Sequence, residues 1–435
     1  MINITVLQLD LIEVILTRMS YTFLMIRWLI ALSMSAGCIN IPDEQTSIPD
    51  DAGIDAGAPD CAPETSTGLV SDVLGNSTIY TAATADLNGD GCADLIVTHV
   101  GGQPGIFVKY GPLDKTGDML RYDEHIITTT QPVALAVANV VGDARLDIVV
   151  FGQTGTTPNT GSGQIQIFEN GESSPHFSQS ITELASFVPA SSNTIGDQPI
   201  HILIGGFGGT GGQNIVVGDL SQLAMFDSNN LGAGSSTVPV DGAMYSSINK
   251  LLPYSDGFLV TERDKIRYYS PTQGTVTTLT AVPAISITSA ELFDIDSAGG
   301  PDVIAAGGTF VGGFLNQLTE PSDLTEITPT DIPTTTDIYQ LSIVPGQPGD
   351  APLAVLFEQT PATIQSYALD SSTGRVNSAN GSTNSIPVGF TPIVAVVLNV
   401  DNSAPSEYWL LSTNGRFLCF VRSENTLMRC PAIGS

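Results

Sequence analysis

Positively charged residues are scarce in this chain. Its 435 residues include 14 lysines and arginines against 44 aspartates and glutamates, which gives a formal net charge of −30. Fourteen cations cannot form a track for phosphates over this length, and the net charge repels polyanions. Nucleic-acid binding is therefore excluded as a main activity. Charged residues of both signs make up only 13% of the chain, so the acidity comes from few cations rather than from many anions.

Catalytic motifs are also missing. The chain contains no H-E-x-x-H, no G-x-S-x-G and no phosphate-cradling G-x-x-x-x-G-K-[ST]. Cations gather only at Arg263, Lys265 and Arg267, for which charges on a solvated strand are the simplest interpretation. The few histidines are expected to be scattered surface or strand residues: His99, His125, His176 and His201.

The N-terminus has no apolar run long enough to span a bilayer. Arg27 precedes a short apolar run, residues 28–32, and small residues follow it up to Cys38. This order is typical of an export signal, so residues 1–37 are predicted to be a signal region. Met19 is the expected true start, because the residues before it fit no signal pattern.

The segment that ends the signal region, Ser35-Ala36-Gly37-Cys38, resembles a bacterial lipoprotein box. That resemblance implies lipidation of Cys38, and ordinary signal-peptide cleavage is the alternative. Residues 38–67 contain seven acids and no cation, which predicts a disordered, self-repelling tether. We therefore expect an exported lipoprotein at the outer membrane or cell surface, or otherwise a secreted or periplasmic protein.

Apart from Cys38, the chain has four cysteines: Cys61, Cys92, Cys419 and Cys430. An even number in an exported chain predicts two disulfides. The preferred pairing is Cys61 with Cys92 and Cys419 with Cys430, because the second pair flanks an expected hairpin. The rival pairing joins Cys61 to Cys430 and would staple the ends of the folded part together.

One loop-and-strand pattern recurs seven times along the chain. Its clearest copy is Asp86-Leu-Asn88-Gly-Asp90-Gly-Cys92-Ala-Asp94, followed by Leu-Ile-Val. The strands that follow the loops are spaced by 43 to 67 residues and begin at Leu95, Ile148, Ile215, Phe258, Val303, Leu353 and Tyr408. Periods of this size indicate stacked or radially arranged units. With three to four short strands per unit, the pattern predicts an all-β fold, a seven-bladed β-propeller over residues 68–435.

This arrangement resembles the FG-GAP/VCBS repeat family, whose members look like the propeller head of integrin α chains. The matching residues are the loop from Asp86 to Asp94 and the strand and turn from Ile165 to Gly171, which lead to Phe177. The resemblance implies calcium in the loops and a role in binding or adhesion. The third, fourth and sixth copies have lost most of their acids, so calcium is not implied there.

Alternating oxygen side chains in a tight glycine-containing loop suit Ca²⁺, which takes six to eight oxygen ligands. In the first copy the expected ligands are Asp86, Asn88, Asp90 and Asp94, with the Cys92 carbonyl. An EF-hand would need a glutamate where Val97 stands, so this loop is not one. A hydrogen-bonded turn without metal is the alternative interpretation.

Three further copies keep part of this ligand set, with turn capping as the competing explanation. Their candidate ligands are Asp294, Asp296 and Asp302; Asn139, Asp143 and Asp147; and Asn399, Asp401 and Glu407. In each case the expected role of calcium is structural, because a bound cation removes the repulsion between close carboxylates.

Two functions remain open from the sequence. The first is a monomeric surface-anchored module that binds protein or glycan and contacts the membrane only through its lipid anchor, with residues 173–199 as a candidate recognition loop. The second is a carbohydrate-active enzyme similar to the propeller-type polysaccharide lyases. Such an enzyme needs a basic or aromatic cleft, and Tyr408 and Trp409 are expected to be core residues instead.

Overall fold

A computed structural model describes the chain between residues 78 and 430. The gaps in this range are 112, 114–121, 141–144, 154–162, 172–176, 188–200, 208–212, 219–222, 229–235, 239–244, 246–247, 271–272, 282–285, 297–299, 317–323, 333–337, 347–349, 360–361 and 399–406. The predicted signal region and tether, with Cys38 and Cys61, lie outside the described residues.

Seven four-stranded antiparallel sheets, here called blades 1 to 7, make up the fold. Blade 1 consists of β1 (Thr78–Ala85), β2 (Asp94–Val100), β3 (Gly105–Lys109) and β4 (Glu124–Ile127). Blade 2 consists of β5 (Gln131–Ala138), β6 (Asp147–Gln153), β7 (Gly163–Asn170) and β8 (Phe177–Phe187). Blade 3 consists of β9 (His201–Gly205), β10 (Asn214–Gly218), β11 (Leu223–Asp227) and β12 (Ser236–Thr237). Blades 4 and 5 are β13 (Ile248–Tyr254), β14 (Gly257–Glu262), β15 (Lys265–Ser270), β16 (Thr275–Ala281); and β17 (Ser289–Phe293), β18 (Asp302–Gly307), β19 (Phe310–Asn316), β20 (Leu324–Asp331). Blades 6 and 7 are β21 (Ile338–Val344), β22 (Leu353–Gln359), β23 (Ala362–Ala368), β24 (Ser382–Ser385); and β25 (Pro392–Leu398), β26 (Glu407–Ser412), β27 (Phe417–Ser423), β28 (Thr426–Arg429).

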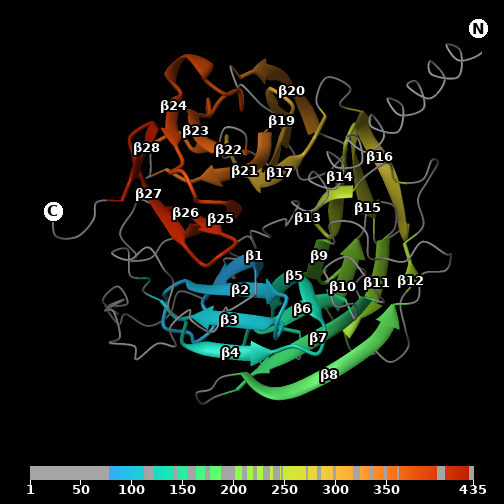
Figure 1. Cartoon of the computed structure of the whole chain (residues 1–435). Helices are drawn as coiled ribbons and strands as arrows, with labels where there is room; N and C mark the ends of the chain where they lie inside the picture. The colour runs from blue at the N-terminus through green and yellow to red at the C-terminus, as the bar shows by residue number, and fades with distance from the viewer. Residues whose placement is uncertain are drawn as a thin grey trace, which may run out of the picture. The chain divides into compact units, whose positions relative to one another are not determined.

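The blades form a closed ring around a centre (Figure 1). Within each blade, strands pair in chain order, so each blade is a meander. The first strands of neighbouring blades contact one another all the way round, from β1 and β5 to β25 and β1. At the closure, the Ile79 N–H in β1 donates to the Thr413 carbonyl beside β26 at 3.0 Å. The predicted seven-bladed β-propeller is confirmed.

All seven predicted post-loop strands are the second strands of their blades, β2, β6, β10, β14, β18, β22 and β26. They read as continuous apolar runs because both faces of each sheet are covered by a neighbouring blade. In β2, Leu95 and Val97 pack with blade 7 residues such as Trp409, whereas Ile96 packs with blade 2 residues. Burying each such side chain contributes about 1.5–3 kcal/mol.

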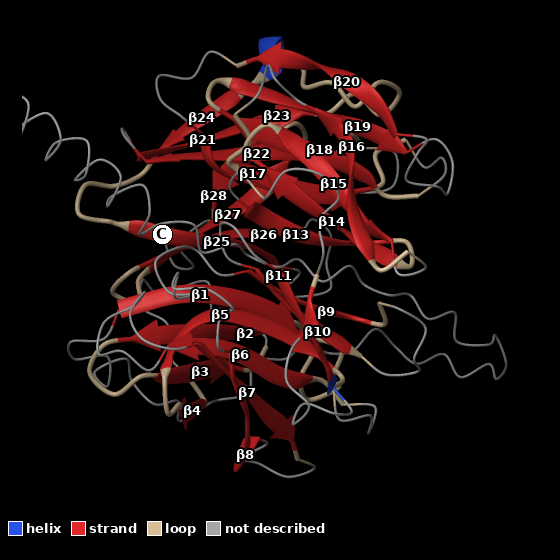
Figure 2. Ribbon diagram, turned by 90° about the vertical axis from the view of Figure 1, so that its right-hand side faces the viewer, coloured by secondary structure: helices blue, strands red, loops and turns tan. Residues whose placement is uncertain are grey.

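The candidate recognition loop 173–199 is in part a strand. Residues 177–187 form β8, the outermost strand of blade 2, which pairs with β7. Residues 188–200 lie outside the described part of the chain. Described secondary structure is almost all strand (Figure 2), and the short 3-10 helix Ser378–Asn380 is one exception. None of the described helices has the length and apolar character needed to cross a membrane.

Candidate functional site

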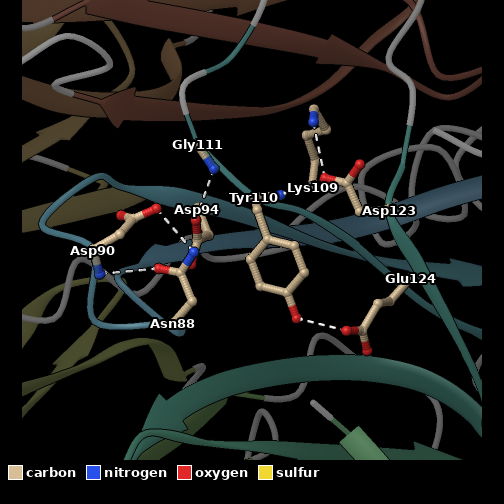
Figure 3. Close-up of polar contacts among 8 residues, drawn as sticks. All are labelled: Asn88, Asp90, Asp94, Lys109, Tyr110, Gly111, Asp123 and Glu124. Atoms are coloured by element: carbon tan, nitrogen blue, oxygen red, sulfur yellow. Dashed lines mark hydrogen bonds and ion pairs between the residues drawn. The ribbon is translucent and has the colours of Figure 1, made fainter. Parts of the chain in front are cut away.

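The loop between β1 and β2 is closed by its own side chains. The Asp86 carboxylate accepts the N–H groups of Gly89 (2.7 Å), Asp90 (3.1 Å) and Gly91 (2.8 Å). The Asn88 amide donates to the Asp90 carboxylate at 2.8 Å (Figure 3). Gly89 and Gly91 have φ values of +74° and +82°, which favour glycine, so the loop needs both. These are the contacts of a hydrogen-bonded turn, and the carboxylates of this loop, unlike those of the fifth loop, do not form a cluster within 4.8 Å.

The last acid of this loop, Asp94, is fully buried, whereas Asp86 is half-buried and Asp90 is exposed. One carboxylate oxygen accepts the Leu87 N–H at 2.7 Å. The other accepts the Gly111 N–H at 2.8 Å, the contact drawn in Figure 3. Burial raises the pKa of Asp94 to about 7, against the lowering effect of these two hydrogen bonds, and the charges of Asp90 and Asp86 raise it further. Asp94 therefore ties the loop to the strands on both sides of it.

We call this arrangement of a buried acid bonded to backbone N–H groups the acid clamp, and it recurs in blades 1, 2 and 5. Such turn capping was the alternative to calcium expected from the sequence. The backbone N–H seven residues earlier donates to the first residue of the second strand, from Leu87 to Asp94, from Val140 to Asp147 (2.8 Å) and from Ile295 to Asp302 (2.7 Å). The second oxygen of Asp147 accepts the Asn170 N–H at 3.2 Å. In blade 3 an asparagine, Asn214, holds this position and donates to the Phe207 carbonyl. The signal that could have revealed the clamp is the fixed seven-residue interval.

The acids of the fifth loop come closest together. Asp294, Asp296 and Asp302 each offer a carboxylate oxygen, and these atoms all lie within 4.8 Å of one another. Among the described residues, this is the one group of three acidic, histidine or cysteine side chains with that property. Asp294 is exposed, Asp296 is half-buried and Asp302 is buried, so the cluster opens to solvent on one side. The arrangement presents hard oxygen ligands to a cation.

The other two predicted loops are only partly described. Asn139 and Asp147 flank their loop, and Asp143 lies outside the described residues. Asn399 and Asp401 also lie outside them. Glu407 is the first residue of β26 and is buried, at the position that Asp94 holds in β2.

The cysteines are partly visible. Cys419 in β27 and Cys430 after β28 form a disulfide with a Cα–Cα distance of 5.3 Å. This is the pairing expected from the hairpin, and it removes Cys61–Cys430 from consideration. Cys92 is also disulfide-bonded, and its partner is not among the described residues.

The described histidines lie in strands, as expected, but two of them are not scattered, and the expectation of solvated cations was wrong for Arg267. His99 and His125 are in contact, with their Nε2 atoms 3.1 Å apart, because β2 and β4 lie in one blade. Arg267 is buried rather than solvated and pairs with the buried Glu262. His176 lies outside the described residues.

The other two cations of this group, Arg263 and Lys265, have polar neighbours. Arg263 donates to Ser286 at 2.9 Å, and Lys265 lies 3.7 Å from Glu262. Tyr408 and Trp409 are fully buried in β26, as expected for core residues.

A polar network joins blades 1 and 2 beside the first loop. Lys109 pairs with Asp123 at 2.8 Å, and the Tyr110 hydroxyl donates to Glu124 at 2.9 Å (Figure 3). The second oxygen of Glu124 accepts the N–H of Phe177 in β8 at 3.5 Å. Burial raises the pKa of Tyr110 above its usual range, and the charge of Glu124 adds to this effect. The network fixes the outer strands of the two blades and was not foreseen from the sequence.

Comparisons with known proteins assign no family to this chain. No protein-family model matches it, and no curated protein matches it. Among solved structures, 425 chains match. One belongs to the crystal structure of BBS1N in complex with ARL6DN, soaked with lead, with 12% identity, a TM-score of 0.48, and coverage of 80% of this chain and 93% of that chain. Similarity at this level carries no argument about function. The chain is a β-propeller by its seven sheets, and its resemblance to FG-GAP/VCBS repeats stays a prediction.

Proposed function

We propose that the chain is a calcium-stabilised β-propeller that binds protein or glycan at the cell surface. The observation that carries the calcium proposal is the gathering of Asp294, Asp296 and Asp302, whose oxygens lie within 4.8 Å of one another. Three carboxylates at this spacing repel one another, and a bound divalent cation converts the repulsion into attraction. The first loop carries oxygen side chains of the same kind, Asp86, Asn88 and Asp90, which in this structure accept backbone N–H groups of the loop.

The clamp and the cation are compatible roles for one carboxylate. Each carboxylate oxygen has two lone pairs, so Asp302 can accept the Ile295 N–H and still coordinate a metal ion. In this proposal the clamp positions the last acid during folding, and calcium then locks the loop around it. Calcium rather than a softer metal fits because every proposed ligand is an oxygen.

Thermal unfolding with and without calcium tests this proposal. Calcium added to chelator-treated protein should raise the melting temperature, because ligands that bind only the folded state stabilise it. Asp296→Asn and Asp90→Ala should each shrink the shift. The matched control is Asp264→Asn, which removes one acid whose side chain is 61% exposed and lies outside the loops; it should leave the shift unchanged. An unchanged melting temperature in the presence of calcium would exclude the assignment.

The binding role rests on architecture and on family resemblance. A ring of rigid blades holds connecting loops in fixed positions, and such loops commonly carry recognition. Binding of the calcium-loaded protein to a glycan array and to surface-protein extracts, with and without chelator, tests this role. Saturable capture that chelator abolishes supports it. Release of unsaturated uronates from acidic polysaccharides by the purified protein would instead favour the lyase-like alternative.

The cellular location is proposed from the N-terminal sequence. Lipidation at Cys38 would anchor the propeller through the acidic tether of residues 38–67. Labelling with a radioactive fatty acid in a bacterial host should mark the wild type and not a Cys38→Ala variant. Equal labelling of both proteins, or of neither, would contradict the lipid anchor.

A further inference from the structure

The two contacting histidines of blade 1 lie far from the acid loop. His99 is near the end of β2 and His125 is in β4, with β3 between these strands. Asp94 begins β2, so His99 lies about 16 Å further along the strand. The Nε2 atoms of the two rings face each other at 3.1 Å. Oxygen ligands for calcium and nitrogen ligands for a softer metal are thus at opposite ends of one strand.

Gly105 in β3 lies against both nitrogens, and a side chain has no room at this position. A Cβ at this position would lie 2.8 Å from the His125 Nε2, 3.0 Å from the His99 Nε2 and 2.5 Å from the Ile126 carbonyl. The backbone of Gly105 is not in the left-handed region, so its conformation does not require glycine. Glycine is needed here because the backbone packs closely against both imidazole nitrogens and the Ile126 carbonyl.

The two rings are held in place by aromatic neighbours. Phe107 stacks on His99 with ring centroids 4.3 Å apart and on His125 at 4.6 Å. Tyr122 stacks on the same phenylalanine at 4.5 Å. His99 is 1% exposed, whereas His125 is half-buried, so the pair can be reached from solvent on the His125 side. A site fixed by packing in this way needs little reorganisation to bind an ion.

Stability alone does not account for the pair. The His99 Nδ1 is buried without a hydrogen-bond partner among the described residues, and leaving such a nitrogen unsatisfied costs about 1–3 kcal/mol. Burial holds the pKa values of both rings below the usual range, that of His99 at about 3. The neutral form of imidazole is the form that coordinates metals.

We propose that His99 and His125 form a two-histidine site for a first-row transition-metal ion such as Cu²⁺ or Zn²⁺. With metal–nitrogen bonds of about 2.05 Å, nitrogens at this separation subtend about 100° at the metal, close to a tetrahedral angle. Imidazole suits these ions and not calcium, which prefers oxygen. The remaining coordination positions are filled by water. This inference does not rest on the proposed function.

Copper titration of the tag-free mature chain, in excess calcium to fill the oxygen sites, tests the inference. Electron paramagnetic resonance should show one Cu²⁺ per chain with hyperfine structure from two imidazole nitrogens. His125→Gln should weaken binding by more than about tenfold, since even outer-shell changes can cost that much. His201→Gln, which removes a buried histidine in β9, should bind as the wild type does.

Two results would overturn the inference. One is a copper spectrum with oxygen ligands only, and the other is equal affinity in the wild type and His125→Gln. Either would leave a hydrogen-bonded imidazole pair and no metal site. His125 is half-buried, so its replacement should fold even where a His99 variant does not, and a melting curve in calcium checks that it has folded.

Discussion

At the scale of single residues, the acid that ends the first, second and fifth loops has a role that the sequence showed only in part. Asp94, Asp147 and Asp302 were predicted as calcium ligands from their place in the motif. The structure buries all three and gives each a backbone N–H from seven residues earlier. The seven-residue interval is visible in the sequence, but which backbone N–H groups the carboxylates accept depends on how tightly the loop turns, and the sequence does not show that.

The clamp can be measured in blade 2. Asp147→Asn should lower the free energy of unfolding by about 1–3 kcal/mol, because the amide cannot accept both the Val140 and Asn170 N–H groups. Urea unfolding in chelator isolates this effect from calcium. A loss no larger than that of Asp264→Asn, within about 0.5 kcal/mol, would show that the clamp is energetically unimportant.

His201 predicts a pH dependence at the same scale. Burial, followed by the positive charge of Lys250, lowers the pKa of His201 to about 3. The unfolded chain, with a histidine pKa near 6.5, binds a proton that the folded protein does not. The stability that comes from keeping His201 neutral is therefore fully present above about pH 6.5. It is lost as the pH falls from there toward 3, by up to about 1.4 kcal/mol per pH unit.

Urea unfolding at a series of pH values, comparing the wild type with His201→Gln, checks this prediction. The variant should show a flatter acid limb. The raised pKa of Asp94 has the opposite effect on stability, because it favours the folded state as the pH falls. The test is therefore the difference in unfolding free energy between the wild type and His201→Gln at each pH, since Asp94 contributes equally to both. Parallel curves for both would contradict the burial of a neutral His201.

At the scale of elements, the sequence located the second strands of the blades and largely missed the fourth. Second strands are covered on both faces, so they show continuous apolar runs such as Leu95-Ile-Val97. Fourth strands lie at the rim and pair on one side only. β12 is Ser236–Thr237 and β24 is Ser382–Ser385, neither of which carries an apolar signal. β8 was taken for a loop even though it carries apolar residues at Ile181, Leu184 and Phe187.

At the scale of the whole molecule, the repeat count predicted seven blades, but nothing local showed how the ring closes. Closure places β1 beside β25 and packs Trp409 of blade 7 with Val97 and Phe107 of blade 1. These residues are about 300 positions apart in the chain, so only the completed ring brings them together. The contact between His99 and His125 was missed in the same way, at the smaller scale of one blade.

The claim that most of this account depends on is that calcium occupies the acid loops. Isothermal titration of Ca²⁺ into chelator-treated protein measures it most directly, with Asp296→Asn, Asp90→Ala and the control Asp264→Asn in parallel. We expect saturable binding in the wild type and the control, and fewer sites or weaker affinity in each loop variant. Absence of calcium binding by the wild type, or equal binding by all four proteins, would contradict the account.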